Sequence, residues 1–152
     1  MKKIALSLFM LVMAFSAMAD GWIYENDGAG IESGYEYVTG NYDRPTVLRV
    51  FVMKDENKKN IVLCVLEGEC TTHNFRKNQQ YVKVEFGWGD SQKWTIKEVP
   101  FEGSNYQAFQ IVNATRFITK LKKAEYFEIV LPLYGHGTQD FHFSANGYPL
   151  DW

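Results

Sequence analysis

The sequence predicts an α+β, mostly β fold: an antiparallel sandwich or a partly open barrel with one helix over about residues 114–123. Short segments in which every second residue is apolar recur between turn-rich segments, as in strands with one buried face. Only one segment has the 3.6-residue period of an amphipathic helix. No internal repeat or linker divides the chain, so a single domain is expected.

The first 19 residues are expected to be a cleaved signal peptide. A basic start is followed by an apolar run over residues 4–15, which is too short for the alternative of a membrane-spanning helix. An A-x-A cleavage site ends at Ala19, so that Asp20 begins the mature chain. Without the two lysines of the basic start, 14 basic residues face 18 acidic ones, a net charge of −4. We predict a periplasmic bacterial domain of residues 20–152, without a transmembrane segment and without nucleic acid as a partner.

The N-terminal half is predicted to begin with a short strand at residues 22–24. The Gly- and Tyr-rich segment 25–44 is interpreted as a long loop or two weak edge strands, with its best strand candidate at residues 35–39. Residues 46–53 and 61–66 are apolar on both faces, which indicates strands buried on both sides. The polar run between them is a turn, so we expect these two strands to pair as a central hairpin.

Cys64 and Cys70 are the only cysteines, and we predict that they form a disulfide. In an exported protein a cysteine pair is more often bridged than free, although two free thiols are the alternative. A three-residue turn ending at Gly68 would place Cys64 opposite Cys70 across a two-stranded ladder. A redox-active pair is not expected, because five residues rather than two separate the cysteines.

The clearest alternation of the chain lies over residues 81–86, after a polar loop at 71–80. A tight turn follows, and a second strand returns over residues 93–97. A further strand over residues 106–112 precedes the helix.

The helix is predicted from its cap and from its apolar stripe. Asn113 is a good N-cap, because its side-chain oxygen can accept hydrogen bonds from the free amides of the first turn. Four apolar residues then fall at i, i+3, i+4 and i+7: Ala114, Phe117, Ile118 and Leu121. A helix of about ten residues with one stripe is not stable alone. We therefore expect it to lie on the hairpin that follows, with strands near 126–131 and 140–145.

No catalytic signature is found in the sequence. Asp140, His142 and Ser144 have the residue types of a hydrolytic triad, but they alternate on one strand at about 6.7 Å per step, whereas triad members converge from separate elements. The histidines lack the spacing of a metal site, and nucleotide-binding glycine patterns are absent. We expect no enzyme, no metal and no cofactor; a hydrolase that uses Asp140 and His142 is the least favoured hypothesis.

Aromatic residues, which make up 16% of the chain, supply the candidate binding residues. Trp88 lies between two glycines at the tip of a turn, where it does not easily join a core. Tyr134 and His136 lie in the turn between the last two strands. Exposed aromatic side chains at loop tips are good anchors for glycan or protein partners; the alternative is that they cap the ends of the sheet.

Several motifs follow one another in the second half of the chain. They are Leu-Cys at 63–64, V-x-V-x-F (Val82, Val84, Phe86), Trp94, F-I-x-x-L-x-x-A (Phe117, Ile118, Leu121, Ala124) and F-x-x-x-G (Phe143, Gly147). With an early Trp, this order resembles exported proteins related to the type VI secretion accessory protein TagO/VasI and to invasion-associated locus B proteins, over about residues 60–147. The resemblance implies a non-enzymatic periplasmic β-rich domain that binds a protein or the cell wall.

These observations together predict a small exported binding or accessory protein without catalytic activity. Its expected partner is an envelope protein or peptidoglycan. The alternative is an inhibitor or immunity protein that acts against a toxin or a wall hydrolase, with which the acidic charge and protruding loops are compatible.

Overall fold

The computed structural model describes residues 21–25, 28–35, 46–68, 81–100, 106–133 and 137–152. These residues form one antiparallel sheet and one short helix. The strands are β1 (Ile23–Glu25), β2 (Gly28–Tyr35), β3 (Thr46–Lys54), β4 (Asn60–Glu67), β5 (Tyr81–Phe86), β6 (Ser91–Val99), β7 (Tyr106–Ile111), β8 (Tyr126–Leu133) and β9 (Gly137–Ser144), and the helix is α2 (Ala114–Leu121).

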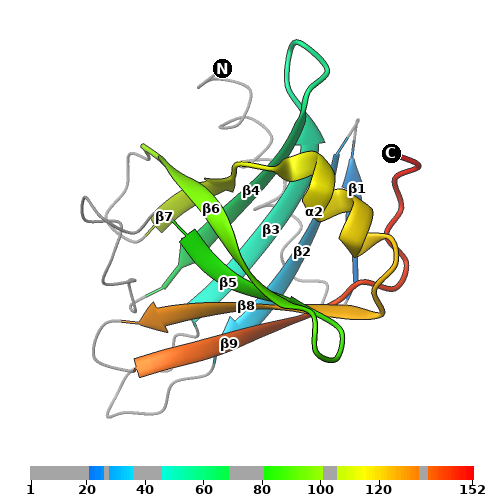
Figure 1. The fold of residues 1–152 in the computed structure, drawn as a ribbon. Helices are drawn as coiled ribbons and strands as arrows, with labels where there is room; N and C mark the ends of the chain where they lie inside the picture. Colours follow the sequence, from blue (N-terminus) through cyan, green and yellow to red (C-terminus); the bar gives the residue numbers. More distant parts are fainter. Residues whose placement is uncertain (1–20, 26–27, 36–45, 69–80, 101–105, 134–136) are drawn as a thin grey trace.

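The sheet curls into a nearly closed barrel, with α2 lying across one end (Figure 1). The strand order is β1-β2-β3-β4-β7-β6-β5-β8-β9, and every pair is antiparallel. The last strand, β9, returns to the side of β2, so strands β2 to β9 enclose the core. The predicted mostly β fold with one helix is confirmed, and of the two architectures it is the barrel that forms.

Strands β5, β6, β8 and β9 have the predicted alternation of buried and exposed residues. Their inward side chains fill the barrel together with those of β3, β4 and β7. The 81–86 and 93–97 segments pair as the β5–β6 hairpin, and the predicted C-terminal hairpin is β8–β9. Because side chains alternate along a strand, each of these strands leaves a polar row on the outside of the barrel.

Strands β3 and β4 pair as predicted and are buried on both faces. Their inward residues join the barrel core, while their outward residues form a second apolar cluster that extends onto β7. We call this cluster the apolar outer wall; it consists of Phe51, Met53, Leu63, Val65 and Ala108, with Ile61 and Val99 partly buried at its edges. The continuous apolar runs at 46–53 and 61–66 therefore correctly predicted strands that are buried on both faces.

The helix is confirmed, including its cap. The side-chain oxygen of Asn113 accepts from the Arg116 amide at 3.3 Å. The ring of Phe117 lies edge-on to those of Phe86, Trp94 and Phe127, with centroids 5.0, 5.6 and 5.7 Å away. These three rings belong to β5, β6 and β8. The prediction that the helix would lie on the β8–β9 hairpin was therefore incomplete, because the sheet order places β5 and β6 beside β8.

The strand β2 corrects the interpretation of the N-terminal segment. Residues 28–35 pair with β3 over their whole length, although 25–44 was predicted as a loop or weak edge strands with residues 35–39 as the best candidate. Its sequence, GAGIESGY, has few side chains that could show a period. Pairing with β3 stabilises it, and this non-local contact overrides its low strand propensity. Residues 36–45 lie outside the described residues.

The hairpin proposed to join the two cysteines is also wrong. Strand β4 continues through Glu67, so that residues 66–67 belong to a strand rather than to a turn. Cys64 faces the barrel interior as a buried free thiol. Its neighbours across the ladders are Val50 and Phe109. Cys70 lies outside the described residues, so the geometric argument for the disulfide is lost.

The two ends of the described chain meet. Trp22 packs edge-on against Tyr148 with ring centroids 5.2 Å apart. The hydroxyl of Tyr148 donates to the backbone oxygen of Trp152 at 2.9 Å, and burial raises the pKa of Tyr148 to about 12. The predicted signal peptide lies outside the described residues. Within the part of the chain that the structure describes, no helix has the length and apolar character needed to cross a membrane.

Candidate functional site

Trp88 projects from the tip of the β5–β6 hairpin. Its side chain is 95% exposed, the most exposed large apolar group among the described residues. Gly87 and Gly89 flank it with φ values of +64° and +80°, a region in which only glycine is free of strain. The amide of Phe86 donates to the carbonyl of Asp90 at 3.0 Å and closes the turn. The backbone therefore directs the indole outward, as the sequence predicted.

The base of this turn is bound to α2. The carboxylate of Asp90 forms an ion pair with Lys120 and accepts from Gln92 at 2.7 Å. Arg116 donates to the other end of the Gln92 side chain, and its guanidinium lies 4.9 Å from the centre of the Trp94 ring. The hydrogen bond from Lys120 holds the pKa of Asp90 below its usual value. These contacts with α2 therefore hold the base of the hairpin turn in place.

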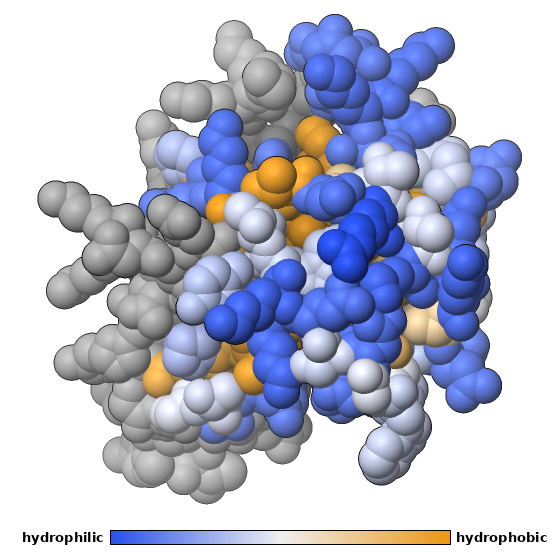
Figure 2. Space-filling model, viewed as in Figure 1, coloured by the Kyte–Doolittle hydropathy of each residue, from blue (hydrophilic) through white to orange (hydrophobic). Residues whose placement is uncertain are grey.

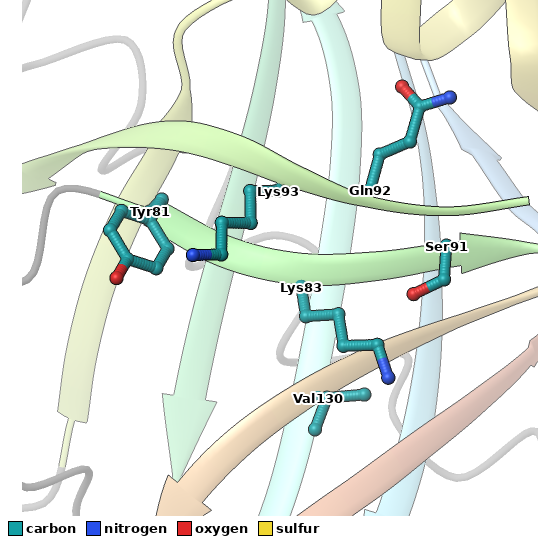
Figure 3. A pocket seen from close by; sticks show the side chains of 6 residues that line it. All are labelled: Tyr81, Lys83, Ser91, Gln92, Lys93 and Val130. Atoms are coloured by element: carbon teal, nitrogen blue, oxygen red, sulfur yellow. The ribbon is translucent and has the colours of Figure 1, made fainter.

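A groove lies on the outer face of the same hairpin, over β5, β6 and β8 (Figure 3). Its volume is about 380 Å³, and it is lined by Tyr81, Lys83, Ser91, Gln92, Lys93 and Val130. We call it the lysine groove. The side chain of Gln92 points away from the groove (Figure 3) and is held by Asp90 and Arg116.

The sheet register places two lysines opposite each other in the groove. Lys83 on β5 faces Lys93 on β6, and on its other side it faces Val130 on β8. Like charges at directly opposite positions are unfavourable in a sheet. The ammonium of Lys93 lies 4.6 Å from the centre of the Tyr81 ring. Among the described residues, neither lysine has an ion pair.

The next row of the outer face is acidic. Glu85 on β5 lies opposite Glu128 on β8. Nδ1 of His142 lies 3.0 Å from a Glu128 oxygen, and its ring stacks on Tyr126 at 5.0 Å. His142 thus contacts Glu128, whereas Asp140 lies opposite Val130. The residues proposed for a hydrolase stay on one strand face, as the spacing indicated.

The described residues contain no group of three or more His, Cys, Asp or Glu side chains that could hold a metal ion. Of the predicted binding residues, Trp88 is placed at an exposed tip, whereas Tyr134 and His136 lie outside the described residues. In the view of Figure 2 the described surface is mainly hydrophilic, with small, separate hydrophobic patches.

The lysine groove was not predicted as a site. The alternation over 81–86 already placed Tyr81 and Lys83 on the outside of the barrel. What it could not supply was the register that sets Lys83 opposite Lys93 or the neighbour strand that brings Val130 to them.

Comparisons with protein-family models, with curated proteins and with solved structures found no match. The resemblance to secretion accessory and invasion-associated proteins therefore stays a prediction.

Proposed function

We propose that this chain is a small exported binding or accessory protein of the bacterial periplasm, without catalytic activity, whose β5–β6 hairpin contacts a protein or cell-wall partner. The observation that carries the proposal is the exposure of Trp88 on a turn that is bound to a helix. An indole that contributes nothing to the core leaves a large apolar surface in water. Tryptophan is also the residue type most enriched among the side chains that dominate binding energy.

The support beneath Trp88 favours this function. Association costs free energy when loops and side chains lose their freedom. Here the turn backbone is closed by the Phe86–Asp90 hydrogen bond and held to α2 by Lys120. Much of the ordering has therefore been completed before a partner arrives.

A second candidate is an inhibitor or immunity protein that acts against a toxin or a wall hydrolase. The same projecting tip favours it, since a single aromatic side chain on a narrow hairpin can enter a cleft. The two candidates differ in what the partner does after binding, because an inhibited enzyme loses its activity.

The test compares mature protein (residues 20–152) with its Trp88→Ala variant in capture from periplasmic extract and in sedimentation with purified peptidoglycan. We expect Trp88→Ala to change the free energy of unfolding by less than about 0.5 kcal/mol and to weaken binding by at least about 2 kcal/mol. Val112→Ala is the matched control, because Val112 is also exposed, at 59%, but lies beyond β7.

Retained binding by Trp88→Ala, together with unchanged stability, would remove the hairpin tip from the interface. Sedimentation with the wall would identify peptidoglycan as the partner. A captured hydrolase or toxin whose activity is blocked by the wild-type protein, and not by Trp88→Ala, would favour the inhibitor.

A further inference from the structure

We infer that the lysine groove binds peptide carboxylates: acidic side chains at alternate positions of an extended peptide segment. The inference rests on the proposed function, since it names the chemistry of the partner beside Trp88. It draws on the register of β5 and β6, on the directions of the two lysine side chains and on the apolar groups at the ends of the groove.

Two of the six residues that line the groove are positively charged. Lys83 and Lys93 face each other across the β5–β6 ladder, and no described carboxylate pairs with either. Of the nearby acids, Asp90 pairs with Lys120 and Glu128 contacts His142. Glu85 lies opposite Glu128 in the adjoining row and forms no ion pair with either lysine. A partner that brings carboxylates would supply the opposite charges that the described residues do not offer these lysines, and complementary charge also favours encounter and correct orientation.

The geometry indicates two carboxylates rather than one. In Figure 3 the ammonium of Lys93 points toward Tyr81, whereas that of Lys83 points the other way, toward Val130. An extended peptide places alternate side chains on the same side, at a spacing of about 6.7 Å. Acidic residues at positions i and i+2 can therefore meet the two lysines separately.

The neutral lining suits the rest of such a segment. The Tyr81 ring is 48% exposed, and Val130 is half-buried, so that both offer apolar surface beside a charge. The hydroxyl of Ser91 points into the groove (Figure 3) and can donate to a carboxylate or a peptide carbonyl. A small carboxylate ion would contact little of this lining. An isolated ion pair at an exposed site also contributes little binding free energy.

Acidic segments of envelope proteins have this chemistry, whereas the stem peptides of the wall, which also carry carboxylates, are the other outcome of the test. The probe for the general chemistry is the capped peptide acetyl-Glu-Gly-Glu-Gly-amide, titrated into ¹⁵N-labelled mature protein at low salt. Its matched control is acetyl-Gln-Gly-Gln-Gly-amide. Purified wall stem peptide, acetate and glucuronate are titrated alongside.

The inference predicts that the Glu peptide binds at least about ten-fold more tightly than the Gln peptide, with shifts at the amides of β5 and β6. Lys83→Gln with Lys93→Gln is expected to remove this difference. Lys59→Gln with Lys123→Gln removes the same charge from exposed sites outside the groove and is expected to leave affinity within about three-fold. Tighter binding of stem peptide than of the Glu peptide assigns the source to the wall, and the reverse assigns it to a protein.

Equal binding of the Gln peptide, an equal loss in the Lys59/Lys123 variant, or glucuronate or acetate that binds as tightly as the Glu peptide would overturn the inference. Trp88→Ala separates it from the proposed function. If Trp88→Ala still captures the partner while the Glu peptide binds the groove, the hairpin-tip proposal fails and the groove stands. If the Glu peptide does not bind while capture depends on Trp88, the groove inference fails alone.

Discussion

The outer surface of the barrel differs between the side formed by β3 and β4 and the side formed by β5 and β6. On the first side, outward residues such as Leu63 and Val65 are as buried as the inward ones. On the second, the outward residues Lys83, Lys93 and Thr95 are exposed, and only the inward ones are buried. Both sides belong to one continuous sheet and enclose the same core.

The difference separates a surface that serves folding from one that is available for binding. Burying an apolar side chain stabilises the fold by about 1.5–3 kcal/mol, so the apolar outer wall contributes as a second core would. Among the described residues, the one buried charged side chain is that of Arg49 on β3, which is paired with Glu32 and Glu67. Over β5 and β6 the outward residues are exposed, where substitutions usually change stability little, and there the candidate site lies.

The largest effect is expected when a charge is placed on the apolar outer wall. Leu63→Asp would bury an unpaired carboxylate at a position that is 4% exposed, and we expect it to destabilise the protein by more than about 4 kcal/mol. Thr95→Asp adds the same charge on the exposed side and should change stability by less than about 0.5 kcal/mol. Urea unfolding of both variants measures this contrast. A cost below about 1 kcal/mol for Leu63→Asp would mean that this wall faces solvent in the protein in solution.

A smaller contrast is expected between the ion pairs of the two sides. The side chain of Arg49 is 9% exposed, and its loss in Arg49→Ala leaves Glu32 and Glu67 without their shared cation, at a cost of about 2–4 kcal/mol. Lys120→Ala breaks the more exposed pair with Asp90 and should cost clearly less than Arg49→Ala. Equal costs in thermal unfolding would contradict the difference in burial between the two pairs.

A substitution at Cys64 tests the barrel core, which both sides of the sheet enclose. Cys64→Ser would bury a hydroxyl among apolar groups and is expected to cost about 1–3 kcal/mol. Burial raises the pKa of the Cys64 thiol, so that it should react with thiol reagents only after unfolding. Titration of unreduced, denatured protein is expected to detect two free thiols. Detection of none would restore the disulfide with Cys70.

The smallest expected effect is on the stability of the fold at acidic pH. Because the pKa of Asp90 lies below its usual value in the folded protein, its ion pair stabilises the fold above the ordinary pKa. This stabilisation is lost as the pH falls through the lowered value. We expect Asp90→Asn to flatten the decline in melting temperature between about pH 5 and pH 2. Adding Lys120→Ala to this variant should flatten it no further, and an additive change would show that the two groups act independently.

Much of the fold could be predicted because it follows from the local spacing of apolar residues in the sequence. Asn113 and the stripe that ends at Leu121 predict the helix to within two residues of its C-terminal end. Alternation predicts the inward faces of β5 and β8, and its absence predicts the double burial of β3 and β4. The exposure of Trp88 also followed from its two neighbouring glycines.

The tertiary structure decided what depends on residues far apart in the sequence. Strand β2 exists because β3 pairs with it, and its glycines carry no pattern of their own. Cys64 lies inside the barrel because β4 runs past it to pair with β7 as well as β3. Register alone brings Lys83 opposite Lys93, since a shift by one residue would turn one of them into the core. The sequence by itself therefore determined which faces are buried, whereas strand order and register determined which exposed side chains meet.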